Sequence, residues 1–326
     1  MTLPVLCLRP RADFERAGAL PPPSLEVTYR GPGDPDVPAL MKTVRALVMP
    51  AVGPPLSPAL FEGTALELIQ VTGAGLDRLD QPAMQRLGVP VANVPGGSNR
   101  AVAEYAVTMA SILLRRFGWA DAEIRRGNYS ECRARMISDN LGGLDGLMVG
   151  VVGLGTIGLA VAEAFQHLGC RICFHDPAPP DPGAARAMGA QPMSLDELLT
   201  MSDVVTLHLP LLPATRHLLG DREMALMKPG AVLIQASRGG IVDEVALATH
   251  LRSGHLGGAA IDVYSTEPPG VESALLALDG EAARRVVFTP HIAGVTRQSA
   301  TFLCRSAWRN VERVLIEGAA PLNRAY

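Results

Sequence analysis

Short apolar runs alternate with helical patterns along the whole chain, an arrangement typical of β-α-β units around parallel sheets. In the first third, five runs rich in aliphatic and β-branched residues predict the strands of one small sheet. These runs cover residues 5–8, 25–29, 45–49, 66–71 and 89–94. A helical pattern then extends from Asn99 to Arg116 and is long enough to connect two domains.

A second series of apolar runs begins at Met148 and predicts a larger sheet. Its six strands are expected at residues 148–153, 171–176, 203–210, 231–237, 257–264 and 285–290. Their near-continuous apolar character is typical of strands that are buried on both faces. The stretch from Gly118 to Gly146 lacks such a pattern, so we expect an irregular connection or subunit contact there. A last helical pattern, residues 296–317, is expected to return the chain to the first domain.

These patterns predict an α/β protein with two doubly wound parallel-sheet domains. A Rossmann-like cofactor domain, residues 99–291, is expected to be inserted into a flavodoxin-like substrate-binding domain, residues 1–98 plus 292–326. Parallel sheets of this kind bind ligands outside the carboxyl ends of their strands. We therefore expect the active site in a cleft between the two domains.

Composition narrows the class of protein. The chain has 326 residues, of which 48% are hydrophobic and 19% charged, with a net charge of -3, as expected for a folded globular protein. Its arginines are scattered among acids, so we predict no nucleic acid partner. No apolar run approaches the roughly 18 residues of a membrane span, and the first residues do not resemble a secretory signal. We expect a cytoplasmic protein without a membrane partner.

The five cysteines are an odd number at irregular spacing, which favours reduced thiols over a disulfide framework. Cys170 and Cys173 form a C-x-x-C sequence, but they fall in a run that reads as a strand. Side chains three residues apart on a strand point to opposite faces. We therefore expect neither a redox pair nor a metal site there.

A glycine motif follows the first strand of the second series. Gly153, Gly155 and Gly158 lie directly after the strand and open a helical pattern. The first glycine permits a tight turn, the second allows backbone amides to approach a pyrophosphate, and the third lets helix and strand pack closely. This context predicts a dinucleotide-binding site.

Asp176 indicates which dinucleotide is preferred. It stands at the end of the next predicted strand, where a carboxylate can accept hydrogen bonds from the ribose hydroxyls of the adenosine. A 2′-phosphate would be repelled by this charge, and no arginine follows before Arg186. NAD is therefore the expected cofactor, and NADP is disfavoured.

Three more segments follow later strands of the second series: Arg238 in the sequence SRGG, Glu267 in TEPP and His291 in TPHIAG. Together with GLGTIG, and in this order, they closely resemble the D-isomer-specific 2-hydroxyacid dehydrogenase family over essentially the whole chain. Supporting segments match at residues 71–80, 93–107, 207–219 and 227–247.

The resemblance implies that Arg238, Glu267 and His291 form the catalytic set. Hydride transfer from the nicotinamide to the C2 carbonyl of a 2-keto acid leaves negative charge on oxygen, which a protonated His291 can neutralise. Glu267 would keep the imidazole charged and oriented. The planar fork of Arg238 would hold the substrate carboxylate. In this interpretation the protein interconverts D-2-hydroxy acids and 2-keto acids.

The resemblance extends to further site residues. It implies pyrophosphate contacts from the backbone amides of Thr156 and Ile157, a bond from Asp262 to the nicotinamide amide, and Thr108 near the nicotinamide. Other positions expected in the cofactor site are Ala236, Ser237 and Gly294. The amides of Gly73, Ala74 and Gly75 are expected to bind the substrate carboxylate together with Arg238. A homodimer is also implied.

The chain departs from common family sequences at two positions: Gln235 replaces a usual Asn, and Thr156 replaces a usual Arg. The physiological acid stays open among 3-phosphoglycerate, glyoxylate, hydroxypyruvate, D-lactate and other branched or aromatic acids. An alternative function is an NAD(H)-sensing binding protein of the corepressor type, which shares the fold and the trio. Oxidation of formate or phosphite is a third hypothesis, but formate oxidation would not need a proton donor at position 291.

Overall fold

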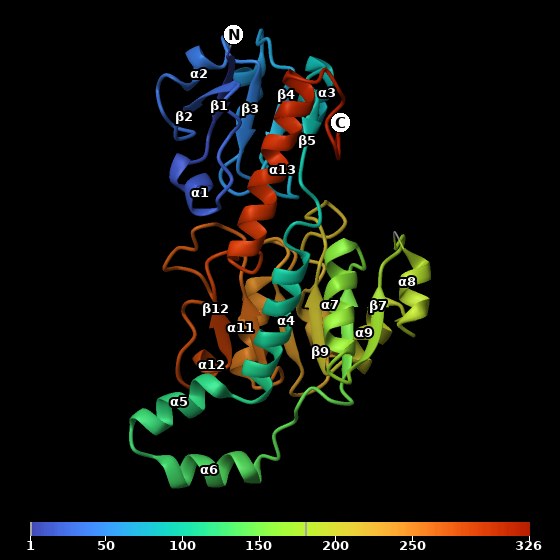
Figure 1. Ribbon diagram of the computed structural model, residues 1–326. Coiled ribbons are helices and arrows are strands. Elements are labelled where there is room, and N and C mark those ends of the chain that lie inside the picture. Colours follow the sequence, from blue (N-terminus) through green and yellow to red (C-terminus); the bar gives the residue numbers. More distant parts are fainter. Residues whose placement is uncertain (1, 180) are drawn as a thin grey trace. The chain divides into compact units, whose positions relative to one another are not determined.

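The computed structural model describes residues 2–179 and 181–326. The chain divides into two compact units, Met1–Ser98 with Val295–Tyr326, and Asn99–Gly294 (Figure 1). Each unit is built on one parallel sheet, which confirms the predicted fold class. The second unit ends at Gly294 and not at His291, because the amides of Ile292 and Ala293 bond to Asp262 of that unit.

The first unit contains a five-stranded sheet in the order β2-β1-β3-β4-β5, the flavodoxin-like order. The strands are β1 (Leu3–Cys7), β2 (Leu25–Tyr29), β3 (Ala46–Met49), β4 (Leu68–Val71) and β5 (Val91–Ala92). The helices are α1 (Arg11–Arg16), α2 (Val37–Leu40), η1 (Pro58–Phe61), α3 (Gln81–Leu87) and α13 (Arg297–Leu315). All five strands coincide with predicted ones.

Helix α13 joins the end of the chain to this first sheet, as expected from the sequence. It contacts β3 and β4. Its buried face, with Trp308 and Val311, lies in one apolar cluster with Phe14 and Val48. A second cluster, which includes Leu47, covers the other side of the strands. Alternate residues of β3 therefore pack on opposite faces, which explains its unbroken apolar sequence.

The second unit contains a seven-stranded sheet in the order β12-β11-β10-β9-β6-β7-β8. The strands are β6 (Met148–Val152), β7 (Arg171–His175), β8 (Gln191–Pro192), β9 (Val204–Leu207), β10 (Val232–Gln235), β11 (Gly258–Ile261) and β12 (Val286–Phe288). Six of them match the prediction. The strand β8 was not predicted, because it has two exposed residues and no apolar run.

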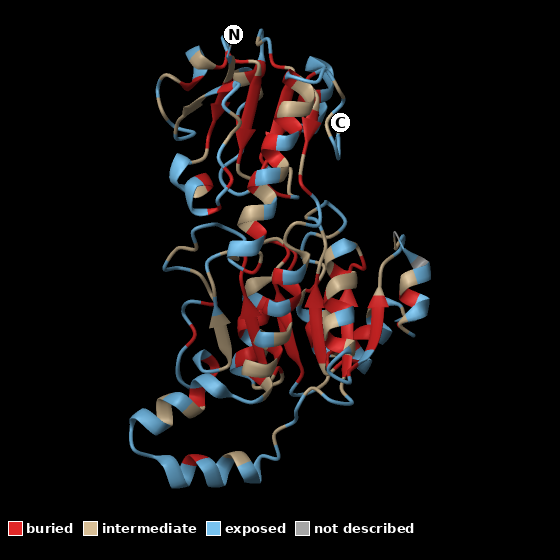
Figure 2. Ribbon diagram, viewed as in Figure 1, coloured by how far each residue is buried: buried red, intermediate tan, exposed pale blue. Residues whose placement is uncertain are grey.

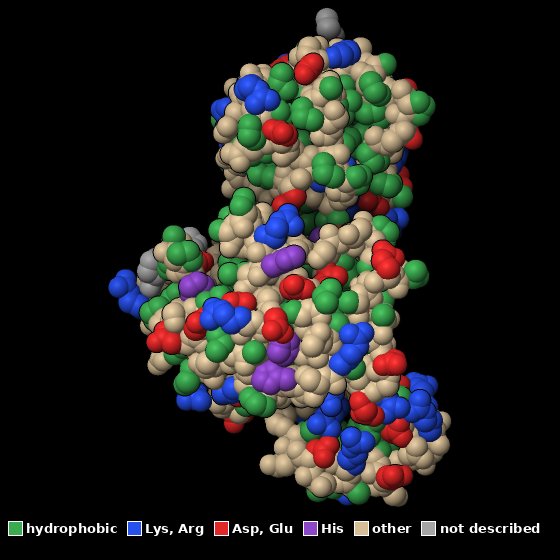
Figure 3. Space-filling model, turned by 180° about the vertical axis from the view of Figure 1, so that it is seen from behind, with side chains coloured by type: hydrophobic (Ala, Val, Ile, Leu, Met, Phe, Trp, Pro, Cys, Tyr) green, Lys and Arg blue, Asp and Glu red, His purple; other side chains and the backbone are tan. Residues whose placement is uncertain are grey.

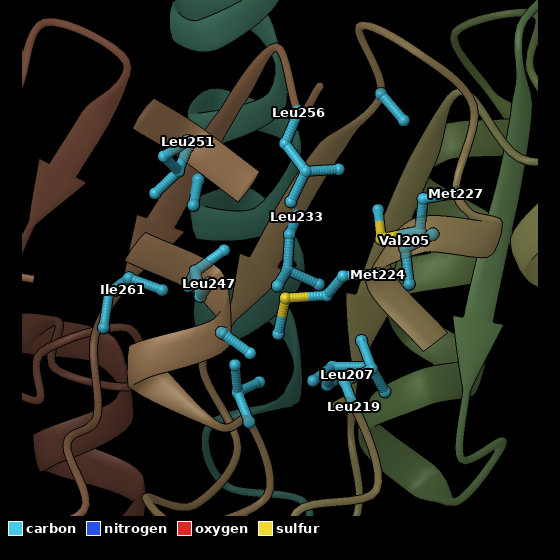
Figure 4. Close-up of a cluster of buried hydrophobic side chains, with 14 of the residues drawn as sticks. Val205, Leu207, Leu219, Met224, Met227, Leu233, Leu247, Leu251, Leu256 and Ile261 are labelled. Carbon is cyan, nitrogen blue, oxygen red and sulfur yellow. The ribbon is translucent and has the colours of Figure 1, made fainter. Parts of the chain in front are cut away.

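Helices pack on both faces of the second sheet. The helices of this unit are α4 (Asn99–Leu114), α5 (Phe117–Arg125), α6 (Tyr129–Ser138), α7 (Thr156–Gln166), α8 (Pro182–Ala187), α9 (Leu195–Met201), α10 (Asp221–Leu226), α11 (Glu244–Arg252) and α12 (Gly280–Ala283), of which α5 and α6 do not cover the sheet. Helices α4 and α7 pack together on one face, while α10 and α11 contribute to a core on the other (Figure 4). The central strands β6, β9, β10 and β11 are buried along their whole length, whereas the edge strands β12 and β8 are not (Figure 2).

The expectation of an irregular segment between Gly118 and Gly146 is wrong for most of its length. Helices α5 and α6 occupy it, and they extend away from the sheet of their unit (Figure 1). Each of the two buries a single residue, Trp119 in α5 and Cys132 in α6. A helix that buries so little has no apolar stripe, so periodicity does not reveal it.

All five cysteines are free and buried. Cys170 lies just before β7 and its thiol points to the carbonyl of Leu144, whereas the thiol of Cys173 lies near the hydroxyl of Ser202. Burial raises the pKa of Cys170 to about 11, so its thiol stays protonated near neutral pH. In the part of the chain that the structure describes, no cluster of three or more ligating side chains could hold a metal ion. No helix among these residues is long and apolar enough to cross a membrane.

Gly150 provides a test of the packing beneath the cofactor turn. A Cβ atom at this position would collide with the hydroxyl of Ser202 and lie 2.5 Å from Leu198 Cδ2. We expect Gly150→Ala to lower the free energy of unfolding by about 1–3 kcal/mol in urea denaturation, because the buried neighbours must shift. Gly143→Ala is the matched control, since a Cβ there meets no atom within 4 Å. Equal stability of the two variants would contradict this account.

Candidate active site

The glycine motif forms a tight turn between β6 and α7. Gly153 has φ = 89°, and a Cβ there would lie 2.6 Å from the carbonyl oxygen of His208. A Cβ on Gly158 would collide with the carbonyl oxygen of Gly153. Gly155 is the N-cap of α7 and faces open space. The first-turn amides of Thr156 and Ile157 have no acceptor within the helix, so the turn can receive an anion.

The carboxylate of Asp176 lies beside this turn. Its Oδ2 accepts from the backbone N–H of Leu154 at 2.7 Å, and its Oδ1 accepts from the N–H of Ala178 at 2.9 Å. A carboxylate oxygen can accept more than one hydrogen bond, so Asp176 can still accept hydrogen bonds from the two hydroxyls of a ribose. The turn, the open space at Gly155 and this carboxylate together fit the phosphates and ribose of a dinucleotide.

His208 follows β9 and supports the turn through its backbone. Its N–H donates to Val152 O at 2.8 Å, and its ring Nε2 lies 2.8 Å from the hydroxyl of buried Thr206. The residue keeps some accessible surface, but its imidazole is enclosed by protein, and this burial lowers the pKa of His208 to about 3. The ring is therefore neutral in the folded protein near pH 7.

His291 and Glu267 come together across two loops that follow β12 and β11. His291 Nδ1 lies 2.9 Å from Glu267 Oε2 and 3.2 Å from Oε1. The N–H of Tyr264 donates to Glu267 Oε1 at 3.1 Å and anchors the carboxylate. An ionised carboxylate only accepts hydrogen bonds, so Nδ1 carries the shared hydrogen and Nε2 is left for another partner. Both side chains keep part of their surface exposed, 26% for His291 and 32% for Glu267.

Arg238 belongs to the loop after β10, and Gln235 shapes this loop. The Nε2 of Gln235 donates to Arg238 O at 2.8 Å, and its Oε1 accepts from the hydroxyl of Ser237 at 2.8 Å. Arg238 Nη1 donates to Ser237 O at 2.8 Å. Gly239 is required because a Cβ there would collide with the carbonyl of Tyr264, on the loop that carries Glu267. The Arg238 and Glu267 loops therefore lie against each other.

Asp262 has a structural role that its sequence position did not indicate. Its carboxylate is 1% exposed and accepts from the backbone amides of Ile292 and Ala293, directly after His291. These bonds pin the turn that carries the histidine.

The remaining predicted residues are placed as follows. Ala236 and Ser237 adjoin Arg238, and Gly294 follows the His291 turn, whereas Thr108 lies exposed on α4. Gly73, Ala74 and Gly75 follow β4 in the first unit. A Cβ on Gly73 would lie 2.7 Å from Ala51 Cβ, and its carbonyl accepts from Val94 N–H at 2.8 Å. The contacts of all the residues named in this paragraph with cofactor or substrate stay predictions.

Sequence reasoning treated Gln235 as a mere departure from the family and missed Tyr105 and Thr289 entirely. Gln235 is a polar residue at the end of an apolar strand, and such a buried amide must be hydrogen-bonded. The sequence therefore already contained the signal that Gln235 holds a neighbouring loop. The contact between Tyr105 and Thr289 joins residues far apart in the sequence, and no local pattern indicates it.

Comparison with known proteins identifies the class. The sequence model of the "D-isomer specific 2-hydroxyacid dehydrogenase, NAD binding domain" matches residues 107–293. The chain is 38% identical over 242 residues to (S)-sulfolactate dehydrogenase of Chromohalobacter salexigens, covering 74% of each protein. It is 34% identical over 266 residues to glyoxylate reductase of Aeropyrum pernix, covering 81% of this chain and 77% of the relative.

A third relative is longer. The chain is 36% identical over 234 residues to D-3-phosphoglycerate dehydrogenase of Archaeoglobus fulgidus, which covers 72% of this chain but only 42% of that protein. Among solved structures, apo D-mandelate dehydrogenase of Rhodotorula graminis has a TM-score of 0.84 at 26% identity, covering 100% of this chain and 98% of the other. The protein belongs to the D-isomer-specific 2-hydroxyacid dehydrogenase family and carries its NAD-binding domain.

The buried imidazole of His208 predicts a pH dependence of stability. Its pKa of about 3 lies below the usual 6.5 of the unfolded chain. Between these values the unfolded state binds a proton that the folded state does not, so stability falls as the pH drops. At pH 5 this difference in proton binding lowers the free energy of unfolding by about 2 kcal/mol. We expect His208→Gln to lose correspondingly less stability than the wild type between pH 7.5 and 5 in urea unfolding. Parallel losses in the two proteins would refute the assignment.

Proposed function

We propose that the protein is an NAD(H)-dependent oxidoreductase that interconverts a D-2-hydroxy acid and its 2-keto acid. The observation that carries this proposal is the His291–Glu267 pair, which leaves one imidazole nitrogen for a substrate oxygen. It lies in the same unit as the glycine turn and Asp176. Bound NADH would supply a hydride to the carbonyl carbon of the keto acid.

His291 completes that reduction by donating a proton to the carbonyl oxygen, and it accepts the proton back in the reverse direction. Glu267 orients the ring and stabilises its charged form. Arg238 binds the substrate carboxylate and polarises the carbonyl. In the first unit, we propose that the amides of Gly73, Ala74 and Gly75 bind a substrate carboxylate. Asp176 favours NAD over NADP, because its charge repels a 2′-phosphate.

Consumption of NADH, with NADPH in parallel, tests the reaction class. The panel contains glyoxylate, hydroxypyruvate, pyruvate, phenylpyruvate, 2-ketoisocaproate and 3-phosphohydroxypyruvate. Because one relative is a sulfolactate dehydrogenase, (S)-sulfolactate with NAD is added in the oxidative direction. We expect one strong substrate and a preference for NADH. If no compound of the panel were turned over while NADH still bound, the proposal would be rejected and the NAD(H)-sensing alternative favoured.

Variants of the trio test the roles of its members. We expect His291→Ala to lower turnover by about two to four orders of magnitude and to leave NADH affinity unchanged, because the proton donor is lost. Arg238→Ala should also raise KM for the keto acid. His167→Ala is a control on an exposed histidine at the end of α7. Normal turnover of His291→Ala would show that the proton comes from elsewhere.

We also propose a homodimer that uses α5 and α6. These helices bury one residue each and leave Phe117, Ile124, Tyr129 and Ile137 exposed. Ile124, Tyr129 and Ile137 line a groove of about 550 Å³. Basic and acidic side chains are intermixed around this part of the surface (Figure 3), so charge does not oppose self-association. Exposed apolar side chains at this density favour a protein partner.

Light scattering during size-exclusion chromatography tests the dimer. We expect twice the 34.4 kDa chain mass for the wild type. Tyr129→Asp combined with Ile137→Asp should yield monomers, because the charges would be buried in the interface. Val245→Asp, at an exposed apolar position on α11, is the control and should stay dimeric. A monomeric wild type would refute the proposal.

A further inference from the structure

Three side chains form a hydrogen-bonded series beneath the His291 turn. The hydroxyl of Tyr105, on α4, lies 2.8 Å from Thr289 Oγ1. The hydroxyl of Thr289 donates to Asp262 Oδ1 at 2.6 Å. A threonine hydroxyl has one hydrogen, and here it goes to the carboxylate. Tyr105 must therefore be the donor in its bond to Thr289, so the series runs in one direction, from Tyr105 to Asp262.

The series ends on the backbone that carries His291. Asp262 Oδ1 accepts from Ile292 N–H at 2.8 Å, and Oδ2 accepts from Ala293 N–H at 2.9 Å. The carbonyl of Asp262 accepts from His291 N–H at 2.8 Å. Three successive amides of the turn are thus bound by one residue.

The turn needs this support because His291 has φ = 56°. Residues with a side chain rarely adopt this left-handed conformation unless neighbouring contacts hold it. The backbone conformation of His291 sets the direction of its ring toward Glu267. A change in the hydrogen bonds of Asp262 would therefore change the orientation of the His291 imidazole.

Both ends of the series are buried. Asp262 is 1% exposed and Tyr105 is 9% exposed, so water competes little for their polar atoms, while Thr289 between them keeps part of its surface. The hydroxyl of Tyr264 donates to Thr289 O at 3.0 Å and holds the backbone of the middle residue. Burial also raises the pKa of Tyr105 above its usual range, which preserves the hydrogen that it donates.

We propose that Tyr105 is a positioning residue for proton transfer at His291, acting through Thr289 and Asp262. Tyr105 touches none of the reacting atoms. It orders the Thr289 hydroxyl so that its hydrogen points to Asp262, which in turn fixes the His291 turn. This inference rests on the proposed function insofar as His291 is the proton donor.

Kinetics of paired variants test the positioning role. Tyr105→Phe removes one hydroxyl, and Thr289→Val interrupts the series next to Asp262. We expect kcat to fall about threefold to tenfold in Tyr105→Phe and further in Thr289→Val, with KM for NADH unchanged. Thr289→Ser keeps the hydroxyl and should recover most of kcat. Tyr29→Phe, in the first unit, removes a buried hydroxyl that has no hydrogen-bond partner among the described residues, and serves as the control.

A purely structural role would lower stability without changing kcat of the folded protein. Wild-type kcat in both Tyr105→Phe and Thr289→Val would therefore overturn the proposal. So would a Thr289→Ser variant as slow as Thr289→Val, because the hydroxyl would then be irrelevant.

Amide hydrogen exchange supplies a readout that does not need a substrate. We expect the amides of Ile292 and Ala293 to exchange about tenfold faster in Tyr105→Phe and Thr289→Val than in the wild type or Tyr29→Phe. If no acid on the panel is reduced but exchange rises, the proposed function fails while the coupling of Tyr105 to the turn stands. Unchanged exchange in both variants would reject the coupling whatever the activity.

Discussion

The candidate site depends on one geometric constraint: the strands of the second sheet are all parallel, so their carboxyl ends meet at one edge. The glycine turn follows β6, Asp176 follows β7, Arg238 follows β10 and His291 follows β12. Residues separated by more than a hundred positions are brought to this edge by strand pairing alone. The burial of the strands on both faces maintains that pairing.

Within this frame, buried polar side chains position the loops. Gln235 binds Ser237 and Arg238 at the start of the loop after β10, and Asp262 binds the turn of His291. Such groups are costly to bury unless every bond is made, so they select one loop conformation. The partly exposed side chains of the candidate site can then be held in place by residues buried beneath them.

The family relationship and the site agree on the class of chemistry, while the relatives differ in substrate. The proteins similar to this chain include a sulfolactate dehydrogenase, a glyoxylate reductase and a phosphoglycerate dehydrogenase. A shared fold does not fix the substrate, so selectivity among acids must come from the side chains of the individual site.

The family resemblance, and not a local pattern, assigned Arg238, Glu267 and His291 as the catalytic set, and that role stays a prediction. The sequence alone predicted the parallel α/β fold, the glycine turn and the carboxylate of Asp176 beside it, because each depends on local patterns: apolar runs, glycine spacing and residues directly after strands. It did not reveal β8, α5 or α6, since these elements bury too little to leave a periodic signal. Only the tertiary structure decided that Asp262 pins the His291 turn and that Tyr105 reaches it through Thr289. Those bonds join distant parts of the chain, and folding alone brings them within reach.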